Sequence, residues 1–460
     1  MIPLEKGKVY FIQGPRRIGK TTYLKKTVSE LLRNNVPAQQ IYYLSAESFT
    51  SRRELRNALQ YYVDSNRGKP IFYIMLDEIT SIKGWDLELQ AVLEPEIMQS
   101  GVVIATASQV MKFTEKTPPL TGVNSIVSRH SIKPICFREF IFQLSGPISA
   151  LMPETLTHDS VLALQVALKS FTLDLTRGLD AINSEALNIM SYRKELDHLL
   201  RIYLITGGFP LAINNYLANI AAKSPVGIDP LSAEVLIRDL LGDLSKAQKQ
   251  ETICRHLLKT MIERYGQRYS FSNLAREIEI THVTAIDYLR FFEDSFLGFI
   301  VYAYDFGKRA PKFKGDKKVY LLDPFLLTAV KSYLDGDSPW AAISAAMDNG
   351  AIWAKIVEGV VLAHLLLNGE TPGLRTARDF LWFYYDKTGR EMGNIIIADG
   401  AYLEIDLKTA GGPEEKSPKK ISQVPACIRL TPDEYRRTRN RLAIPLSVFL
   451  ALLSPSAPNL

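Results

Sequence analysis

The chain begins with a strand–loop–helix pattern that restricts its fold more than any other stretch. An apolar run, Val9–Gln13, precedes Gly14-Pro15-Arg16-Arg17-Ile18-Gly19-Lys20-Thr21-Thr22, and residues 23–33 follow with apolar side chains at helical spacing. A glycine-flanked loop that ends in Gly-Lys-Thr between a strand and a helix is typical of a phosphate-binding loop. The alternative is a glycine turn before a structural helix, and the flanking elements favour the phosphate-binding loop.

The residue types of this loop suit a nucleotide and Mg²⁺. Gly14 and Gly19 let backbone N–H groups turn around an anion, and the start of the helix adds partial positive charge. Lys20 would bind the β- and γ-phosphates, and the Thr21 hydroxyl would bind Mg²⁺. We therefore expect ATP and Mg²⁺ as cofactors. The expected nucleotide contacts are Gly14, Pro15, Arg16, Arg17, Ile18, Gly19, Lys20, Thr21 and Thr22.

A second motif follows the apolar run 71–76, which ends in Asp77-Glu78. In an ATPase, Asp77 would hold Mg²⁺ directly or through water, and Glu78 would be the catalytic base that deprotonates the attacking water. Acidic residues also end many strands simply because they lie at the surface. The preceding phosphate-loop pattern favours the functional interpretation.

Two further catalytic candidates lie later in this region. The strand expected at 102–107 ends in Thr106-Ala107-Ser108-Gln109, where Ser108 or Gln109 would sense the γ-phosphate and position the water. A plain strand-to-loop transition explains these residues equally well. Arg129 would stabilise transition-state charge as an arginine finger, or it is a solvated strand residue.

The first 145 residues alternate short apolar runs with helical patterns, which predicts an α/β fold with a parallel sheet covered on both faces. The expected strands, after the first, are 41–45, 71–76, 102–107 and 126–135.

These motifs together resemble the AAA-type ATPases common in archaea and bacteria. The resemblance rests on the phosphate loop, on Leu76-Asp77-Glu78-Ile79 with Trp85, on Thr106-Ala107-Ser108 and on Arg129. Residues 134–140 resemble the family's junction segment, and Gly207-Gly208-Phe209-Pro210 resembles its helical segment. The resemblance implies a helical lid over the nucleotide, a C-terminal nuclease-like domain of unknown function, and relatives that form rings.

Length and composition limit the number of domains, the partners and the cellular compartment that we expect. The 460 residues suffice for about three domains. The net charge of +6 is compatible with nucleic acid but is too small to indicate it. The three cysteines, Cys136, Cys254 and Cys427, suit a reducing cytoplasm and disfavour a disulfide framework. The chain starts directly with a strand, so we expect no signal peptide. No apolar run reaches the roughly 18 residues of a membrane span, so we expect no membrane partner.

Residues 146–460 are expected to hold three more domains. A helical lid or linker would occupy residues 146–245, a winged helix 246–325, and a restriction-endonuclease-like α/β domain 326–460, after the ATPase domain at 1–145. The winged helix is a fold-level inference from three helical segments and a basic hairpin, with a recognition helix starting at Thr284. The exposed candidates of that helix are His282, Thr284, Asp287 and Arg290.

The basic hairpin is the expected wing, and DNA is one candidate partner for it. Six cations fall in this loop, namely Lys308, Arg309, Lys312, Lys314, Lys317 and Lys318. A solvated hairpin tip would have the same composition, and winged helices also serve as protein-packing units.

The last domain carries acidic residues in a nuclease-like arrangement. Period-two alternation places Glu404, Asp406 and Lys408 on one face of a strand. With Glu391 on a neighbouring strand and Glu358 on the preceding helix, this pattern resembles the restriction-endonuclease-like core, which binds Mg²⁺. The Asp expected at the head of the strand entering the site is replaced by Gly393 and Asn394. We therefore interpret the domain as degenerate; a polar strand face is the alternative.

The sequence thus predicts a Mg²⁺-dependent ATPase whose nucleotide state moves the winged-helix and nuclease-like parts. The alternatives are a nucleotide-gated DNA-binding or signalling scaffold with little hydrolysis, and a metal-dependent nuclease centred on Asp406 and Lys408. An oligomer is compatible with the sequence, and whether Arg129 acts within its own subunit is left open.

Overall fold

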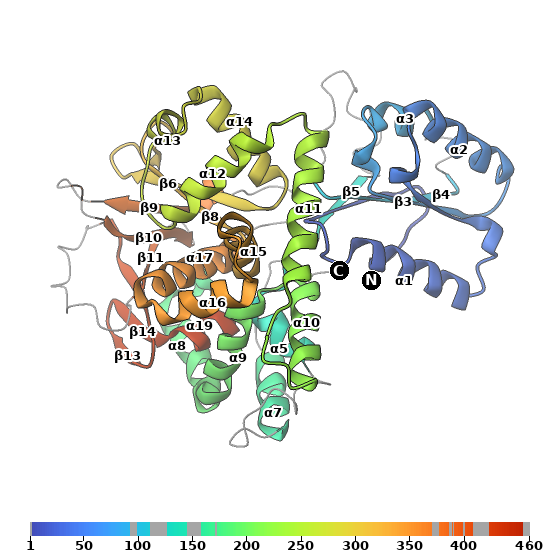
Figure 1. Cartoon of the computed structure of the whole chain (residues 1–460). Helices are drawn as coiled ribbons and strands as arrows, with labels where there is room; N and C mark the ends of the chain where they lie inside the picture. The colour runs from blue at the N-terminus through green and yellow to red at the C-terminus, as the bar shows by residue number, and fades with distance from the viewer. Residues whose placement is uncertain are drawn as a thin grey trace. The chain divides into compact units, whose positions relative to one another are not determined.

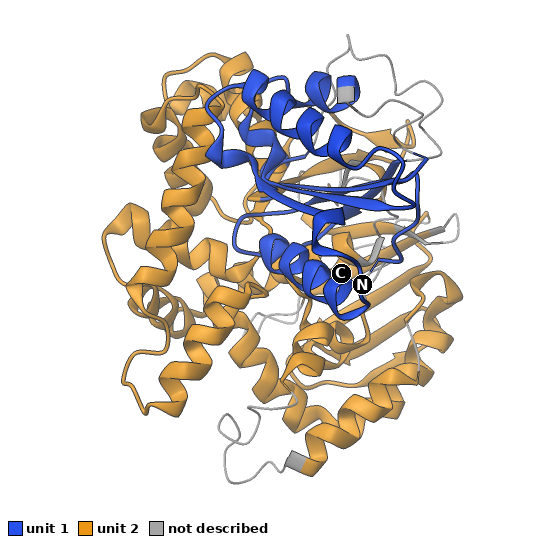
Figure 2. Cartoon of the chain, turned by 90° about the vertical axis from the view of Figure 1, so that its right-hand side faces the viewer, with its two compact units in different colours: residues 1–133, 294–296, 459–460 blue, residues 134–293, 297–458 orange. Residues whose placement is uncertain are grey.

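A computed structural model describes residues 2–92, 99–110, 127–144, 158–170, 173–369, 377–385, 389, 391–398, 401–407 and 423–453. The chain divides into two compact units, coloured separately in Figure 2. Unit 1 comprises residues 1–133 and 294–296, and unit 2 comprises residues 134–293 and 297–458, leaving the extreme C-terminus aside. All the nucleotide motifs fall in unit 1, whereas the C-terminal acidic residues fall in unit 2. Lys408 lies outside the described residues.

Unit 1 is built on a five-stranded parallel sheet with the order β2-β3-β4-β1-β5. The strands are β1 (Val9–Gln13), β2 (Ile41–Ser45), β3 (Phe72–Asp77), β4 (Gly101–Ala107) and β5 (Val127–Ser131). The predicted α/β class and the parallel sheet are confirmed. The expected strand at 126–135 is too long, because β5 ends at Ser131.

Helices cover both faces of this sheet (Figure 1). Helix α1 (Lys20–Arg33) lies on one face, and α2 (Arg52–Ser65) and α3 (Trp85–Val92) lie on the other. Every residue of β3 and β4 is buried, as expected for central strands covered on both sides. Phe11, Ile74 and Val103 pack with Leu59 and Trp85 in the core. Short 3₁₀ turns connect the elements: η1 (Ala38–Gln40), η2 (Ala46–Ser48) and η3 (Ile79–Ser81).

Unit 2 begins before the boundary expected at residue 145. Helix α5 (Phe137–Gln143) packs in this unit, where the rings of Phe137 and Phe140 contact Tyr203 with centroids 5.6 and 5.5 Å apart. The Nε2 atom of His364 accepts a hydrogen bond from the backbone N–H of Phe137 at 2.9 Å. These buried contacts explain why α5 groups with unit 2.

The other helices of unit 2 are α7 (His158–Lys169), α8 (Gly178–Ile189), α9 (Arg193–Thr206), α10 (Pro210–Ala221), α11 (Pro230–Lys246), α12 (Glu251–Glu263), α13 (Phe271–Glu277), α14 (His282–Asp294), α15 (Pro324–Asp335), α16 (Pro339–Asp348), α17 (Gly350–Gly369), α18 (Ala377–Phe380) and α19 (Leu446–Leu452). Its 3₁₀ turns are η4 (Leu175–Arg177) and η5 (Met190–Tyr192).

A nine-stranded sheet runs through the C-terminal half of unit 2, in the order β13-β14-β12-β11-β10-β9-β6-β7 with β8 also paired to β6. Its strands are β6 (Gly298–Asp305), β7 (Ala310–Pro311), β8 (Lys317–Leu321), β9 (Leu381–Tyr385), β10 (Glu391–Ala398), β11 (Ala401–Leu407), β12 (Ala426–Thr431), β13 (Arg436–Thr438) and β14 (Arg441–Pro445). Because β6 pairs with β9, one sheet joins the segment interpreted as a wing to the segment interpreted as nuclease-like.

The basic loop differs from the expected solvated wing in one respect. Lys317 and Lys318 belong to strand β8 and are only 3% and 2% exposed. Their assignment to an exposed basic wing is therefore wrong, because backbone pairing with β6 continues through both residues and places them inside unit 2.

Helix α17 contains the stretch Gly350–Leu367, whose length and mean hydropathy of 1.7 would suit a membrane span. The expectation that no apolar run has this length is therefore wrong. The stretch is 61% buried inside the protein and carries Glu358, which pairs with Lys318. Burial and an internal ion pair are properties of a core helix.

Candidate nucleotide-binding site

The phosphate-loop motif lies between β1 and α1, where the sequence places it. Gly19 has φ of 105°, a left-handed conformation that a side chain strongly disfavours, and α1 starts at the next residue. The first turn of α1 holds no acidic residue, and no side chain caps its start. Negative charge is favoured near a helix N-terminus, so this end of α1 suits a phosphate.

Strand β4 lies between β1 and β3, so the ends of these three strands are neighbours. The carboxyl ends of parallel strands are where α/β proteins bind ligands. Lys20 follows β1, Asp77 ends β3 and Ser108 follows β4. The sheet topology therefore gathers motifs that are far apart in the sequence.

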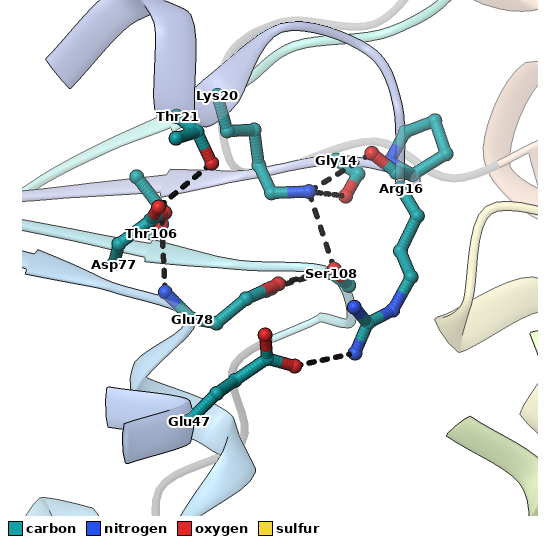
Figure 3. Close-up of polar contacts among 10 residues, drawn as sticks. Gly14, Arg16, Lys20, Thr21, Glu47, Asp77, Glu78, Thr106 and Ser108 are labelled. Carbon is teal, nitrogen blue, oxygen red and sulfur yellow. Dashed lines mark hydrogen bonds and ion pairs between the residues drawn. The ribbon is translucent and has the colours of Figure 1, made fainter. Parts of the chain in front are cut away.

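Lys20 is 6% exposed and its ammonium is held by the loop itself (Figure 3). The Nζ atom donates to the carbonyl oxygens of Gly14 and Pro15, both at 2.9 Å, and to Ser108 Oγ at 3.3 Å. A buried ammonium with such partners is fixed in place.

Asp77 is the centre of a hydrogen-bond cluster. Its Oδ2 accepts from Thr21 Oγ1 at 2.7 Å and from the Tyr43 hydroxyl at 3.0 Å, while its Oδ1 accepts from Thr106 Oγ1 at 2.6 Å. A carboxylate beside a threonine hydroxyl is a donor set that Mg²⁺ accepts. Burial, followed by the charge of Asp77, raises the pKa of Tyr43 to about 12, so this phenol stays a donor at neutral pH.

Glu78 has a strained backbone and a well-defined side chain. Its φ of 53° is left-handed, a conformation that costs a non-glycine residue about 1–3 kcal/mol and recurs at functional sites. Its N–H donates to Thr106 Oγ1 at 3.0 Å, and Ser108 Oγ lies 2.6 and 2.5 Å from its two carboxylate oxygens. The turn and Ser108 together aim the carboxylate toward Lys20.

The remaining predicted residues lie as follows. Arg16 pairs with Glu47 of η2 at 3.2 Å, and Arg17 has a left-handed φ of 62°. Gln109 is half-buried beside Ser108. Arg129 is exposed on edge strand β5, in register with Phe11, two positions before the end of that strand.

Sequence reasoning missed Tyr43, Thr106 and Glu47. Thr106 lies two positions before Ser108, a spacing that puts both side chains on one side of an extended chain, and the sequence does contain this signal. Tyr43 carries no such signal, because the sequence does not say that β2 lies beside β3.

The acidic residues of unit 2 are not brought together. Asn394 is in register with Ile405, and Glu404 with Ile395, so Asn394 and Glu404 project to opposite faces of the sheet. Glu358 Oε1 accepts from Asn394 Nδ2 at 3.4 Å, so Glu358 lies on the same face of the sheet as Asn394 and opposite Glu404. The predicted grouping of Glu358 and Glu391 with Glu404 and Asp406 is wrong for this reason.

Each of these carboxylates already has a partner. Asp406 Oδ2 pairs with Arg429 at 2.8 Å, and Glu404 Oε1 accepts from the Tyr384 hydroxyl at 2.9 Å. Within the part of the chain that the structure describes, no group of three His, Cys, Asp or Glu side chains is arranged to hold a metal ion.

A cavity of about 690 Å³ lies elsewhere in unit 2, and its lining includes Asp197, Arg201, Tyr216, Trp340 and Trp353. None of the predicted site residues lines it, so it is separate from the phosphate loop.

The strand order, the loop and the Asp77–Glu78 pair define unit 1 as a P-loop α/β domain. A family model described as an AAA domain matches residues 6–141, so the chain carries an AAA-type domain at its N-terminus. A second family model, a domain of unknown function, matches residues 197–337. An uncharacterized protein of Methanocaldococcus jannaschii is 24% identical over 98% of this chain and 86% of its own length.

Solved structures give weaker likenesses. A DNA clamp loader delta protein of Bacillus subtilis is 14% identical, with a TM-score of 0.22. The match covers 61% of this chain and 83% of the delta protein. A DNA replication initiation factor is 13% identical, with 63% and 83% covered and a TM-score of 0.24. C. elegans PCH-2 is 14% identical, with a TM-score of 0.20. The match covers 36% of this chain and 52% of PCH-2.

Proposed function

We propose that unit 1 binds ATP with Mg²⁺ and hydrolyses it. The single observation that carries the proposal is the chain of hydrogen bonds from Lys20 through Ser108 to Glu78, beside the Thr21–Asp77 contact. Lys20 would bind the phosphates, Thr21 and Asp77 would hold Mg²⁺, and Glu78 would accept a proton from the attacking water. When bound, ATP supplies the anhydride bond and Mg²⁺ neutralises phosphate charge.

The residues of the chain have distinct roles in this proposal. Lys20 leaves the carbonyl oxygens of Gly14 and Pro15 when a phosphate offers stronger, charged acceptors. Thr106 holds the Asp77 carboxylate and the Glu78 backbone in one arrangement. Ser108 positions Glu78 and senses the γ-phosphate. Arg129 is proposed as an arginine finger, supplied within the subunit or to a neighbouring one.

Two variants test the proposal. Lys20→Ala should abolish the thermal stabilisation that millimolar ATP and Mg²⁺ give the wild type. Glu78→Gln should keep that stabilisation and lower the hydrolysis rate about 10²–10⁴-fold, the contribution typical of general base catalysis. Lys25→Ala is the matched control, because Lys25 is an exposed lysine on the same helix α1. Unchanged hydrolysis by Glu78→Gln would remove the base assignment, and unchanged stabilisation of Lys20→Ala would remove the nucleotide site.

Nucleotide state is proposed to move the rest of the chain. In this proposal residues 146–245 act as a helical lid, residues 246–325 as a winged helix, and residues 326–460 as a degenerate nuclease-like domain. Ring-like association and a cytoplasmic location belong to the same proposal. The three free cysteines, all buried, support a reducing compartment.

DNA binding by the hairpin is the second candidate function. Three of its cations, Lys308, Arg309 and Lys314, are exposed, and Lys312 is half-buried over the ring of Tyr385. None of these four forms an ion pair with another described residue. Between them Phe313 is 58% exposed. Unpaired cations flanking an exposed aromatic ring suit phosphates and an unstacked base.

A further inference from the structure

The cavity of about 690 Å³ in unit 2 takes no part in the proposed ATPase. Helices α9, α10, α16, α17 and α19 contribute to its lining, with α9 packed on α19 and α16 packed on α17 (Figure 1). Most of the lining side chains are apolar, and three are aromatic: Tyr216, Trp340 and Trp353. Small-molecule sites are clefts of about 300–1,000 Å³ with mainly apolar and aromatic walls and a few polar groups. The cavity has the size and the lining of such a site.

The indole of Trp340 is held in place at the cavity wall. Trp340 lies in the first turn of α16, where the side chain of Ser338 accepts from the N–H of Ala341 at 3.1 Å and caps the helix. A Cβ atom at Gly227 would lie 2.4 Å from the Trp340 ring, so the ring occupies space that a side chain at residue 227 would need. Although it is fixed in this way, Trp340 is only half-buried. It therefore offers a preformed surface to an aromatic ring.

The polar groups of the lining that lack an internal partner are donors. In the part of the chain that the structure describes, Arg201 forms no hydrogen bond or ion pair, and the indole N–H groups of Trp340 and Trp353 have no acceptor. Burial raises the pKa of Tyr216, so its hydroxyl keeps its proton, and the charge of Arg201 acts on this hydroxyl. Guanidinium and indole groups donate hydrogen bonds and cannot accept them. A ligand therefore has to supply the acceptors.

The two acidic residues of the lining leave Arg201 without a counter-charge. Asp197 already has two partners, because its Oδ1 accepts from Ser447 Oγ at 2.5 Å and its Oδ2 lies 3.4 Å from Arg193 Nε. Asp348 is the last residue of α16 and is exposed, so solvent and salt screen its charge. Arg201 is thus the charged group of the lining that is available to an anionic ligand.

We propose that this cavity binds an aromatic carboxylic acid, with its carboxylate on Arg201 and its ring against Trp340 and Trp353. A guanidinium matches a carboxylate with two parallel N–H···O bonds, and the apolar walls remove the ring from water. The whole lining belongs to unit 2, so the site does not depend on the nucleotide site of unit 1.

The test titrates the full-length protein, by calorimetry, with three ligands of similar shape and different charge. These are 2-naphthoate, the neutral 2-naphthamide and the cationic 2-naphthylmethylamine. We expect 2-naphthoate to have the lowest Kd and the amine the highest. Arg201→Gln should raise the Kd of 2-naphthoate about tenfold and leave that of 2-naphthamide within about twofold, because only the anion gains a charge-assisted pair. Arg238→Gln is the matched control, since Arg238 is an exposed arginine of α11 outside the lining.

A second variant tests the place of binding. Ser344 is half-buried in the lining, and Ser344→Phe fills part of the cavity, so 2-naphthoate should no longer bind. A Ser344→Phe protein with the wild-type melting temperature and wild-type affinity would overturn the proposal. If Ser344→Phe does not fold, Arg201→Gln decides.

Three further results would contradict the proposal. The first is that none of the three ligands binds at millimolar concentration. The second is that the amine binds more tightly than 2-naphthoate, which would mean that the acidic residues determine the charge of the ligand. The third is that Arg201→Gln and Arg238→Gln change the Kd of 2-naphthoate equally.

Discussion

Ser108 Oγ lies within hydrogen-bond distance of both carboxylate oxygens of Glu78, at 2.6 and 2.5 Å, and accepts from Lys20 Nζ at 3.3 Å. This hydroxyl links the lysine of the phosphate loop to the proposed base. Its position at the end of β4 depends on that strand lying between β1 and β3.

Removal of this hydroxyl tests its role. We expect Ser108→Ala to lower the rate of ATP hydrolysis about tenfold, because a base held less precisely contributes less than the 10²–10⁴-fold typical of general base catalysis. The dissociation constant for ATP should change less than twofold. Steady-state hydrolysis and nucleotide titration measure the two quantities. Faster hydrolysis would show that Ser108 restrains Glu78 and would contradict the positioning role.

Tyr43 is predicted to adjust the affinity for Mg²⁺. Its hydroxyl donates to Asp77 Oδ2, the same oxygen that accepts from Thr21, and so orients the proposed metal ligand. We expect Tyr43→Phe to raise the Mg²⁺ concentration for half-maximal hydrolysis about three- to tenfold, since a hydrogen bond to a charged group is worth about 1.5–3 kcal/mol when buried and less at this half-exposed site. The rate at saturating Mg²⁺ should stay unchanged.

Tyr42→Phe is the matched control for this experiment. Tyr42 precedes Tyr43 in β2 and stacks on Tyr62 with centroids 4.6 Å apart, so its ring points to the other side of the strand. If Tyr42→Phe and Tyr43→Phe shift the Mg²⁺ requirement equally, the hydrogen bond to Asp77 is not the cause.

The hairpin is predicted to give a salt-dependent affinity for DNA. Changing Lys308, Arg309, Lys312 and Lys314 together to glutamine should reduce the slope of log K against log salt by up to about 4, because each neutralised phosphate contributes about 0.9 for duplex DNA. Fluorescence anisotropy with duplex and single-stranded oligonucleotides measures the slope. The matched control changes four exposed cations of unit 1, Lys25, Lys26, Arg33 and Lys69, to glutamine. No DNA binding at low salt would dismiss this function.

The nucleotide motifs could be predicted because they depend on local patterns. An apolar run followed by Gly-Lys-Thr or by Asp-Glu can be recognised from the sequence alone. Strands β1 and β2 start and end at the expected residues. Tyr43 could not be found, because its contact with Asp77 depends on strand order rather than on spacing.

The errors in the C-terminal half have the same origin. Lys318 belongs to a run of charged residues whose composition is typical of a solvated loop. Pairing of β8 with β6 instead buries it against Glu358 and Glu391, two carboxylates that are far away in the sequence. Period-two alternation placed Glu404 correctly relative to its own strand. It could not show that the β10 register, which shifts between Glu391 and Gly393, leaves Glu391 and Asn394 on the side of Glu358.

Asp323, which precedes α15, is buried and has a raised pKa. Its carboxylate accepts from the backbone N–H groups of Gly208 and Phe325, at 2.7 and 2.8 Å. Gly207 has φ of 60°, and a Cβ at this residue would lie 2.0 Å from Asp323 Oδ1, so the turn at Gly207 admits no side chain. Burial outweighs the hydrogen bonds and raises the pKa of Asp323 from 3.8 to about 7.

This shift predicts how stability depends on pH. Between pH 3.8 and 7 the folded protein keeps a proton on Asp323 that the unfolded chain has lost, so the group makes unfolding easier as pH rises through this window. The contribution is at most about 1.4 kcal/mol per pH unit. Asp323→Asn removes the titration and, because its amide nitrogen cannot accept, also one of the two backbone hydrogen bonds. That loss does not depend on pH, so from pH 5 to 7 the wild type should lose more stability than this variant. Urea unfolding followed by tryptophan fluorescence measures the difference, with the exposed Asp337→Asn as control. Equal pH slopes for wild type and Asp323→Asn would mean that Asp323 is already ionised in the folded protein at pH 5.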